Sequence, residues 1–347
     1  MAKENSGAWG KTYSKIFSII FFAILVVQLL SPDLSLSNIS DHFLWRKALV
    51  QSFSAFRYTM GDKVFNAGLV GKDGWLYYSG DFSINDYQKT ALMGPHRLED
   101  LAGILNLLNE SVTRHGGVLW VIIPPDKNTI YPQYMPVEIP VIGKSSRLDQ
   151  LTEYLQEKTK LNILDLRPVF NPISRSSQLY YKTDAHWNCL GAYYASNELF
   201  AKIGVLYPEV QVHPLSDFQI GSTTDFSLDI LAAMGLGSHE ETVTLTPKFP
   251  TGTMSYGTYE NNESIKVAVN SKKDLPNMMV LHDSFYTECL NQFIEPQFSK
   301  TLSVHYQSIL LSDYIKLIDA EKPDVVIVEF AEREIEYFFK LVSRKAK

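Results

Sequence analysis

Tyr181-Lys182-Thr183-Asp184-Ala185-His186-Trp187-Asn188 places a carboxylate and an imidazole two residues apart, directly before a segment with helical spacing. Side chains at i and i+2 of an extended segment point to the same side, so Asp184 and His186 can face one cavity. Asn188 is a favourable N-cap, and apolar residues then recur at threes and fours until Gly204, which predicts a helix. An Asp and a His held in this way supply the base of a nucleophilic triad and the group that orients it. The alternative is that His186 only caps or packs.

A second stretch, Met278-Met279-Val280-Leu281-His282-Asp283-Ser284-Phe285-Tyr286, supplies a candidate nucleophile. Its apolar run is typical of a buried parallel strand, and amphipathic residues follow, so the pattern predicts a strand, a tight turn and a helix. A serine in that turn lies at the carboxyl edge of a sheet and beside a helix N-terminus, where backbone N–H groups can stabilise an oxyanion. Ser284 can therefore complete a catalytic triad with His186 and Asp184. The alternative, for this stretch taken by itself, is a serine that serves only as an N-cap.

The two motifs together resemble a known family. Thr183-Asp184-Ala185-His186-Trp187 with the later Asp283-Ser284-Phe285 is similar to the alginate O-acetylation proteins of the AlgX/AlgJ type, a branch of the SGNH hydrolase superfamily. Three further matches are Gly71-Lys72-Asp73-Gly74-Trp75-Leu76-Tyr77, Pro125-Asp126-Lys127-Asn128-Thr129-Ile130-Tyr131-Pro132 and Val328-Glu329-Phe330-Ala331-Glu332-Arg333. The resemblance runs from about residue 64 to residue 335.

The order of the motifs along the chain supports this resemblance. Ordinary members of the superfamily place the serine first and an Asp-x-x-His last, whereas here Asp-x-His precedes the serine, as in the alginate-type branch. His282 departs from that branch, in which a glycine usually precedes Asp-Ser. The larger side chain can crowd the turn or bring a second imidazole to it.

These residues predict serine acyl transfer. His186, oriented by Asp184, removes the Ser284 proton; Ser284 attacks an acetyl donor, and a sugar hydroxyl then collects the acetyl group. The resemblance implies a secreted or cell-envelope polysaccharide as acceptor and a polytopic membrane O-acyltransferase as the partner that moves acetyl groups outward. Two other functions stay open: a carbohydrate acetylesterase, with water as the acceptor, and a non-catalytic polysaccharide-binding subunit of an export or modification complex.

Composition and charge exclude several other classes of function. The 347 residues are 45% hydrophobic and 20% charged, which suits one large domain or a domain with a subdomain. A net charge of -6 without a basic patch argues against nucleic acid, and an acidic polysaccharide would need local cations. No metal or nucleotide cofactor is expected, because metal-ligand spacings, a Gly-rich phosphate loop and a CxxC motif are all missing from the sequence.

Helix and strand alternate through the chain. Buried strands are predicted at Val118–Ile123, Asn162–Leu166 and Asp324–Phe330, in addition to the one before Ser284, with amphipathic helices between them. This alternation predicts an α/β three-layer sandwich, in which helices cover both faces of a mostly parallel central sheet. The resemblance implies the same fold, that of the SGNH hydrolases.

Ligands of such folds lie beyond the carboxyl ends of the strands. Asp126 and Lys127 follow the first strand, and Glu332 and Arg333 follow the last, so these four are candidate substrate-binding residues. The alternative is that they form ordinary salt bridges between loops.

The N-terminal part predicts export. Lysines precede the apolar run Ile16–Leu30, and no favourable cleavage site follows, so residues 1–32 are interpreted as a signal anchor that leaves the catalytic domain outside the cytoplasm, in the periplasm or at the cell surface. A connector, residues 33–63, carries aromatic side chains that we expect to pack on the domain. The catalytic domain, residues 64–340, begins with a predicted hairpin at Val64–Tyr78 around an Asp-Gly turn.

The segment 205–271 interrupts the alternation. It is rich in Gly, Ser and Thr, with β-like runs at Thr242–Thr246 and Ile265–Val269, which predicts an insertion or a β-rich cap near the mouth of the site. Cys189 and Cys289 each follow a triad residue by five positions. They can pair in an oxidising compartment or remain free and buried, and the sequence leaves both possibilities open.

Overall fold

The computed structural model describes residues 45–224, 229–236 and 239–343, together with a few positions of the N-terminal segment: Lys15, Ser18, Ile19, Phe22, Ala23 and Val26. The predicted anchor, residues 1–32, and the first part of the connector lie largely outside the described residues. Among those that are described, no helix is both long enough and apolar enough to cross a membrane. Two compact units are distinguished: a small one that contains residues 45–62, and a large one that contains the sheets.

The small unit contains helix α2 (Arg46–Thr59). Within this unit α2 leaves aromatic side chains open, since Trp45 is 60% exposed, Phe53 62% and Phe56 59%. Packing of the connector's aromatic side chains on the domain stays a prediction. Apolar spacing predicts that a helix has an apolar face but not which surface covers it.

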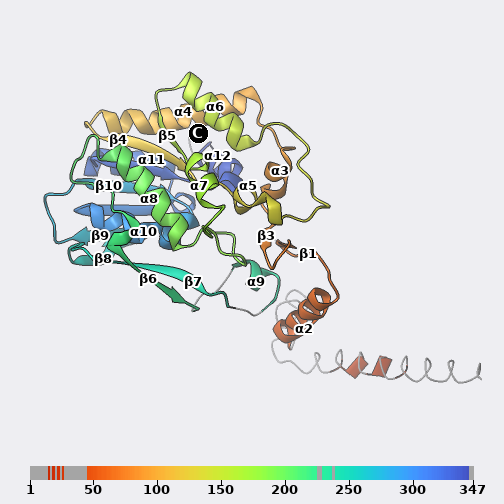
Figure 1. Cartoon of the computed structure of the whole chain (residues 1–347). Coiled ribbons are helices and arrows are strands. Elements are labelled where there is room, and N and C mark those ends of the chain that lie inside the picture. Colours follow the sequence, from red (N-terminus) through yellow and green to blue (C-terminus); the bar gives the residue numbers. More distant parts are fainter. Residues whose placement is uncertain are drawn as a thin grey trace, which may run out of the picture. The chain divides into compact units, whose positions relative to one another are not determined.

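The large unit is built on a mixed β-sheet (Figure 1). In the described part of the chain this sheet has seven strands, in the spatial order β5 (Asn162–Asp165), β4 (Val118–Ile123), β12 (Val325–Glu329), β10 (Asn277–His282), β11 (Lys300–His305), β9 (Asn262–Asn270) and β8 (Met254–Tyr259). Neighbours from β5 to β11 run parallel, and β9 and β8 are antiparallel additions at one edge. The prediction of a mostly parallel central sheet is confirmed.

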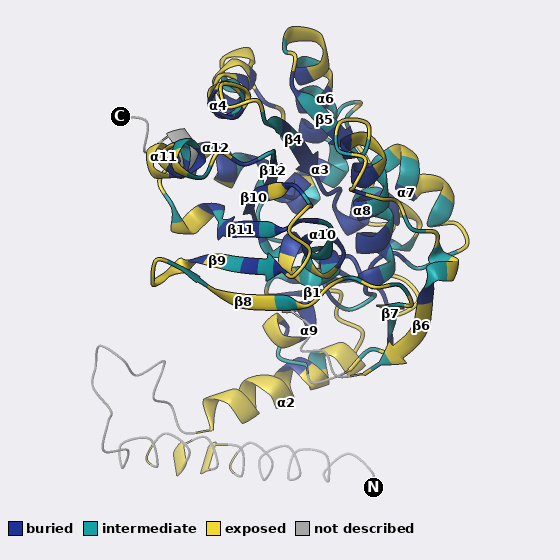
Figure 2. Cartoon of the chain, turned by 90° about the vertical axis from the view of Figure 1, so that its left-hand side faces the viewer, coloured by how far each residue is buried: buried dark blue, intermediate teal, exposed yellow. Residues whose placement is uncertain are grey.

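Helices cover both faces of this sheet, as expected for a three-layer sandwich. Alternate side chains of a strand point to opposite faces, so Met279 and Val326 pack on one side, and Met278 and Val325 on the other. The Met279 face is covered by α4 (Pro95–Thr113), α6 (Arg147–Lys158), α11 (Leu311–Glu321) and α12 (Ile335–Ser343), and the Met278 face by α7 (Arg167–Ile173), α8 (Cys189–Ile203) and α10 (Asn291–Ile294). The central strands are accordingly buried, whereas the edge strand β8 is largely exposed (Figure 2).

Two parts of the sheet differ from the prediction. Strand β11 was not foreseen, and the run Ile265–Val269, assigned to a cap, lies in β9 of the central sheet. The pairing that places it there, for example Thr301 with Ala268, joins residues far apart in the sequence, and local patterns do not reveal it. Within the segment 205–271, the antiparallel ribbon of β6 (Phe218–Thr223) and β7 (Thr242–Pro247) does lie outside the central sheet.

The predicted hairpin opens the large unit. Strands β1 (Val64–Phe65), β2 (Gly68–Val70) and β3 (Leu76–Tyr78) form a small antiparallel sheet. Asp73 and Gly74 have φ angles of 53° and 80° in the turn between β2 and β3, which is the left-handed conformation that an Asp-Gly pair tolerates. The short helices are α3 (Ser83–Gln88), α5 (Lys127–Ile130) and α9 (Asp229–Ala233).

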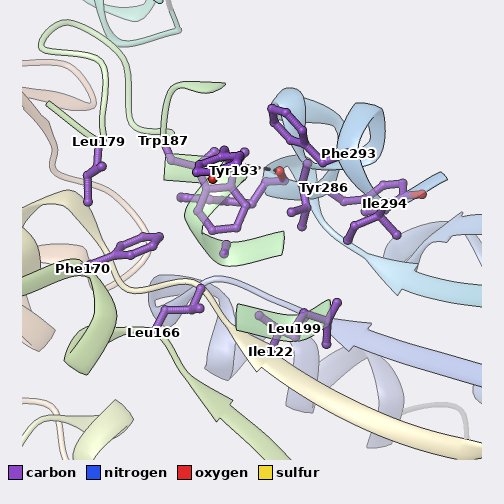
Figure 3. Close-up of a cluster of buried hydrophobic side chains, with 14 of the residues drawn as sticks. Ile122, Leu166, Phe170, Leu179, Trp187, Tyr193, Leu199, Tyr286, Phe293 and Ile294 are labelled. Atoms are coloured by element: carbon purple, nitrogen blue, oxygen red, sulfur yellow. Dashed lines mark hydrogen bonds between the residues drawn. The ribbon is translucent and has the colours of Figure 1, made fainter. Parts of the chain in front are cut away.

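The core on the Met278 face contains the tryptophan of the Asp-x-His-Trp motif. Trp187 is fully buried, and its ring meets Phe285 edge-on at 5.0 Å between centroids and Phe170 at 6.3 Å. Figure 3 shows Trp187 in this cluster with Phe170, Leu179 and Tyr193. Because the motif's own aromatic residue is a core residue, packing fixes the loop that carries Asp184 and His186.

Candidate active site

The two sequence motifs meet at the carboxyl edge of the sheet. His186 Nδ1 lies 2.7 Å from Asp184 Oδ1, and His186 Nε2 lies 2.8 Å from Ser284 Oγ. With the carboxylate as acceptor, Nδ1–H donates to Asp184, and Nε2 is left to accept the Ser284 hydroxyl proton. Asp184 and His186 are buried, whereas Ser284 is partly exposed, so an acyl group can reach its oxygen. The chain of hydrogen bonds has the order of an acid, a base and a nucleophile.

The turn that carries Ser284 is fixed by the neighbouring Asp283. Its Oδ1 accepts from the Phe285 N–H at 2.8 Å, and its Oδ2 accepts from the Ala331 N–H at 2.7 Å. The Asp283 N–H in turn donates to Glu329 Oε2 at 3.0 Å. These bonds tie the end of β10 to the end of β12 and hold Ser284 just beyond the sheet.

Glu329 is a site residue whose role sequence reasoning missed. It is fully buried at the end of β12, and burial together with the charge of Asp283 raises the pKa of its carboxyl well above the usual range. A protonated Glu329 adds no second negative charge beside Asp283. A single glutamate closing the apolar strand Val325–Glu329 is the signal that could have found it.

The segment after Ser284 is not the regular helix that the sequence predicts. Glu288 and Cys289 leave helical geometry, with φ of 67° at Cys289, before α10 begins at Asn291. Cys289 forms a disulfide with Cys189, whose Cα lies 5.1 Å away, and this settles the question that the sequence left open. The disulfide joins the first residue of α8 to the Ser284 segment.

A side chain provides another link between the same two segments. The Trp187 indole N–H lies 2.8 Å from the Glu288 carbonyl and 3.1 Å from the Phe285 carbonyl, and donates to both. The side chain of Asn188 caps α8 by accepting from the Leu190 and Gly191 N–H groups, which confirms the predicted N-cap. The Asp-x-His loop is thus anchored to the serine segment on one side and to a capped helix on the other.

The backbone of the Asp-x-His loop is held between a cation and an anion. The Lys127 ammonium donates to the carbonyls of Tyr181, Lys182 and Asp184 at 3.0, 3.0 and 2.6 Å. The Glu240 carboxylate accepts from the N–H groups of Lys182 and Thr183 at 2.8 and 2.9 Å. Glu240 lies in the irregular segment 205–271, where no sequence pattern marks it.

The structure buries the four loop residues that the sequence marks as candidate substrate-binding residues. Asp126, Lys127, Glu332 and Arg333 are each at most 6% exposed, and they bond within the protein. Arg333 pairs with Asp126 at 3.0 Å, and Glu332 Oε2 accepts from the Asp126 N–H at 2.9 Å. Burial raises the pKa of the Glu332 carboxyl to about 8. These bonds link the loops at this edge of the sheet, and substrate binding by the four residues stays a prediction.

No metal centre accompanies the site in the residues that the structure describes, where no group of three His, Cys, Asp or Glu side chains is arranged to hold an ion.

His282, the residue that departs from the family pattern, lies behind the turn. Its Nδ1–H donates to the Asp283 carbonyl at 2.7 Å, and its ring is 4.6 Å from Tyr286 and 5.8 Å from His305. Burial, reinforced by His305, lowers the pKa of His282 to about 4. His282 is therefore neutral at pH 7 and serves as a packed hydrogen-bond donor.

Acidification is expected to cost stability through His282. Because its pKa falls from 6.5 in the unfolded chain to about 4 in the folded protein, only the unfolded state takes up the proton between these values. Stability therefore falls as the pH drops through this window, by on the order of 2 kcal/mol at pH 5. Denaturant unfolding at pH 7 and pH 5 should show this loss in the wild type and in the exposed control His96→Gln, but a smaller loss in His282→Gln. An equal loss in all three would show that His282 does not contribute.

Removing the disulfide is expected to destabilise the large unit. The bond closes a loop of 100 residues, so Cys189→Ser/Cys289→Ser should lower the free energy of unfolding by about 2–5 kcal/mol. Reductant should lower the free energy of unfolding of the wild type to that of the double variant. It should leave the free energy of unfolding of the double variant unchanged. A wild-type unfolding midpoint that does not respond to reductant would contradict the expectation.

Comparison with known proteins places this arrangement in a family. Residues 69–263, more than half of the chain, match the family described as "SGNH hydrolase-like domain, acetyltransferase AlgX". The chain belongs to this AlgX family. The matched region contains Asp184 and His186 and ends before Ser284, so the serine is assigned to the site by the geometry of this chain.

This AlgX-family chain has low sequence identity to the individual proteins that it resembles. It is 26% identical over 152 residues to a probable alginate O-acetylase AlgJ of Pseudomonas syringae, a match that covers 42% of this chain and 37% of that protein. Among solved structures, Bacillus cereus PatB1 with a sulfonyl adduct has a TM-score of 0.61 at 16% identity, covering 80% of this chain and 99% of PatB1. The O-acetyltransferase domain of Pseudomonas putida AlgJ has a TM-score of 0.51 at 15% identity, covering 78% and 92%. These structures share the fold.

Proposed function

We propose that this chain transfers acetyl groups to hydroxyl groups of a secreted or cell-envelope polysaccharide, through a Ser284–His186–Asp184 triad and an acetyl-serine intermediate. One observation carries the proposal: the hydrogen-bonded order of Asp184, His186 and Ser284. Membership of a family described as acetyltransferases supports it, and so do relatives named as alginate O-acetylases.

In the first half-reaction, His186 Nε2 takes the Ser284 proton as Oγ forms a bond to the acetyl carbon of the donor. The donor's leaving group departs with that proton, and the acetyl-serine remains. Asp184 stabilises the positive charge that forms on the imidazole. The Phe285 N–H is already bonded to Asp283, so we assign the oxyanion to the N–H of Ser284 itself.

In the second half-reaction, His186 Nε2 removes the proton from a sugar hydroxyl, whose oxygen attacks the acetyl carbon. The bond to Ser284 Oγ then breaks, and the serine regains its proton from the imidazolium. The same steps with water in place of the sugar would give a carbohydrate acetylesterase.

The test compares transfer with hydrolysis. The protein is given p-nitrophenyl acetate as donor, with or without deacetylated alginate or β-mannan oligosaccharides, and both acetate release and sugar acetylation are measured. Acetylated sugar that accumulates faster than acetate would support the transferase. Acetate release alone would favour the esterase, and a folded chain with neither activity would favour a non-catalytic polysaccharide-binding subunit.

We also propose that the large unit acts outside the cytoplasm, next to a membrane O-acyltransferase that supplies acetyl groups. The Cys189–Cys289 disulfide supports this placement, because such bonds persist in oxidising compartments. Thiol labelling of protein taken directly from cells should find both cysteines blocked until reductant is added. Free thiols would argue against export.

A further inference from the structure

A large cavity lies apart from the triad. It has a volume of about 560 Å³, within the range of small-molecule sites, and opens between the second half of α8, the β6–β7 ribbon, α10 and the segment 272–275. Asp274 and Leu275 precede β10, whereas Ser284 follows its other end. Since β10 has six residues, roughly 20 Å of strand separates the two places. The cavity is therefore not the acyl-transfer site.

The floor of the cavity is aromatic. Tyr193, Phe218 and Phe293 are buried and meet edge-to-face at 5.3 to 6.1 Å between centroids (Tyr193 and Phe293 are drawn in Figure 3). Phe249, which is only partly buried, stands at the wall and stacks on His213 at 3.7 Å. Aromatic faces carry partial negative charge and attract the partly positive C–H face of a hexose ring.

Amide side chains line the walls. Asn197, Gln211, Gln292 and Gln297 each offer both donors and acceptors, which suits sugar hydroxyl groups. Three of them are already oriented: Asn197 donates to the His213 carbonyl at 3.0 Å, Gln292 donates to Cys189 Sγ at 3.2 Å, and Gln297 exchanges hydrogen bonds with the Gln211 backbone at 3.1 and 3.2 Å. Groups fixed before a ligand arrives lower the entropic cost of binding.

The charges around the cavity disfavour an acidic sugar. Glu209 and Asp274 are negative and exposed, and the ammonium of Lys272 already donates to the Pro250 carbonyl at 2.8 Å. The whole chain also carries a net charge of -6. A uronate carboxylate would meet a net negative surface, whereas a neutral hexose would not.

We infer that this cavity binds a neutral hexose segment of the polysaccharide acceptor and holds the polymer while a more distant unit is acetylated at Ser284. The role of the cavity in holding the acceptor rests on the proposed acetyl transfer. Binding of the sugar itself does not require the triad. It assigns this chain a neutral-hexose acceptor rather than a polyuronate.

Binding is measured first in the Ser284→Ala protein, by calorimetric titration with hexasaccharides of β-1,4-mannose, β-1,4-glucose and β-1,4-mannuronate. At least one neutral sugar should bind, and mannuronate should bind more weakly. Phe249→Ala should weaken binding of the neutral sugar roughly tenfold, because an aromatic face that stacks on the sugar ring is lost. The matched control is Tyr256→Ala, an exposed aromatic on β8 that does not line the cavity, and it should leave affinity unchanged. The double variant Glu209→Gln/Asp274→Asn should bring the affinity for mannuronate closer to the affinity for the neutral sugar.

Catalysis supplies the second arm of the test. With Ser284 restored, Phe249→Ala should raise the KM for the neutral polysaccharide by a larger factor than it changes kcat, and Tyr256→Ala should leave the hydrolysis of p-nitrophenyl acetate unchanged. If no neutral sugar binds, if mannuronate binds better, or if Phe249→Ala binds as tightly as the control, the inference is wrong even where acetyl transfer proceeds. If sugar binds but Ser284→Ala still transfers acetyl groups, the proposed function fails and the binding site stands.

Discussion

Replacing Ser284 with alanine is expected to abolish acetyl transfer, and replacing His186 with alanine should be as damaging. Each variant should lose on the order of 10⁴–10⁶-fold in kcat, because one removes the nucleophile and the other removes its base. The double variant should lose no more than either single one, since the pair works as one unit. The measurement is acetyl release and transfer, with thermal unfolding followed in parallel.

Asp184→Asn should keep the fold but lose on the order of 10⁴-fold in kcat for acetyl transfer, because an amide in place of the carboxylate favours the wrong tautomer of the His186 imidazole. A suitable control is Ser174→Ala, which removes a partly exposed hydroxyl that donates to the nearby Asn171 carbonyl. Near-normal transfer by a folded Ser284→Ala protein would end the acyl-enzyme account and leave the binding-subunit function in its place.

Lys127→Met is expected to lower kcat by roughly 10²-fold with little change in KM, because a small displacement of a catalytic group has this cost. The ammonium holds three carbonyls of the loop that carries Asp184, and it lies 5.3 Å from the centre of the Tyr77 ring and 5.7 Å from that of Trp75. Without it the buried carbonyls of Tyr181 and Asp184 lose this donor, and an unsatisfied buried group costs about 1–3 kcal/mol, whereas the Lys182 carbonyl keeps the Leu76 N–H at 2.7 Å.

Stability has to be separated from catalysis in this experiment. Assays should therefore run well below the unfolding midpoint of the variant, with Lys72→Met as control. Lys72 is exposed, and its ammonium bonds to the Gln133 carbonyl at 3.3 Å. A rise in KM with unchanged kcat would show instead that Lys127 contacts the acceptor, as first expected from its position after β4.

Local patterns were enough to predict much of this fold. The strands Val118–Ile123 and Asn277–His282 and the helix capped by Asn188 were found because apolar spacing and capping chemistry act within one segment. Strand β9 was assigned to a cap because its antiparallel pairing with β11 depends on residues that are distant in sequence, and β8, which pairs with β9, was not predicted. Nothing within Ile265–Val269 distinguishes a strand of a cap from a strand of the central sheet.

The residues of the candidate site also fall into those that local sequence patterns predict and those that they do not. Asp184, His186 and Ser284 were predicted because each sits in a short motif with a recognisable turn. The contacts of Glu240 and Glu329 were not predicted, because each acts on a backbone segment far along the chain. Arg333 was given a substrate role because a charge after a strand has the same pattern whether it faces solvent or, as here, a buried partner such as Asp126.

Covalent labelling of the serine tests the central claim most directly. The folded protein is treated with phenylmethylsulfonyl fluoride, and the modified peptide is identified by mass spectrometry. The triad predicts one sulfonyl adduct, on Ser284, that is absent from Ser284→Ala, forms much more slowly in His186→Ala, and appears together with the loss of acetyl transfer. Full loss of transfer without label on Ser284, or label on Ser284 in a protein that still transfers acetyl groups at its normal rate, would contradict it.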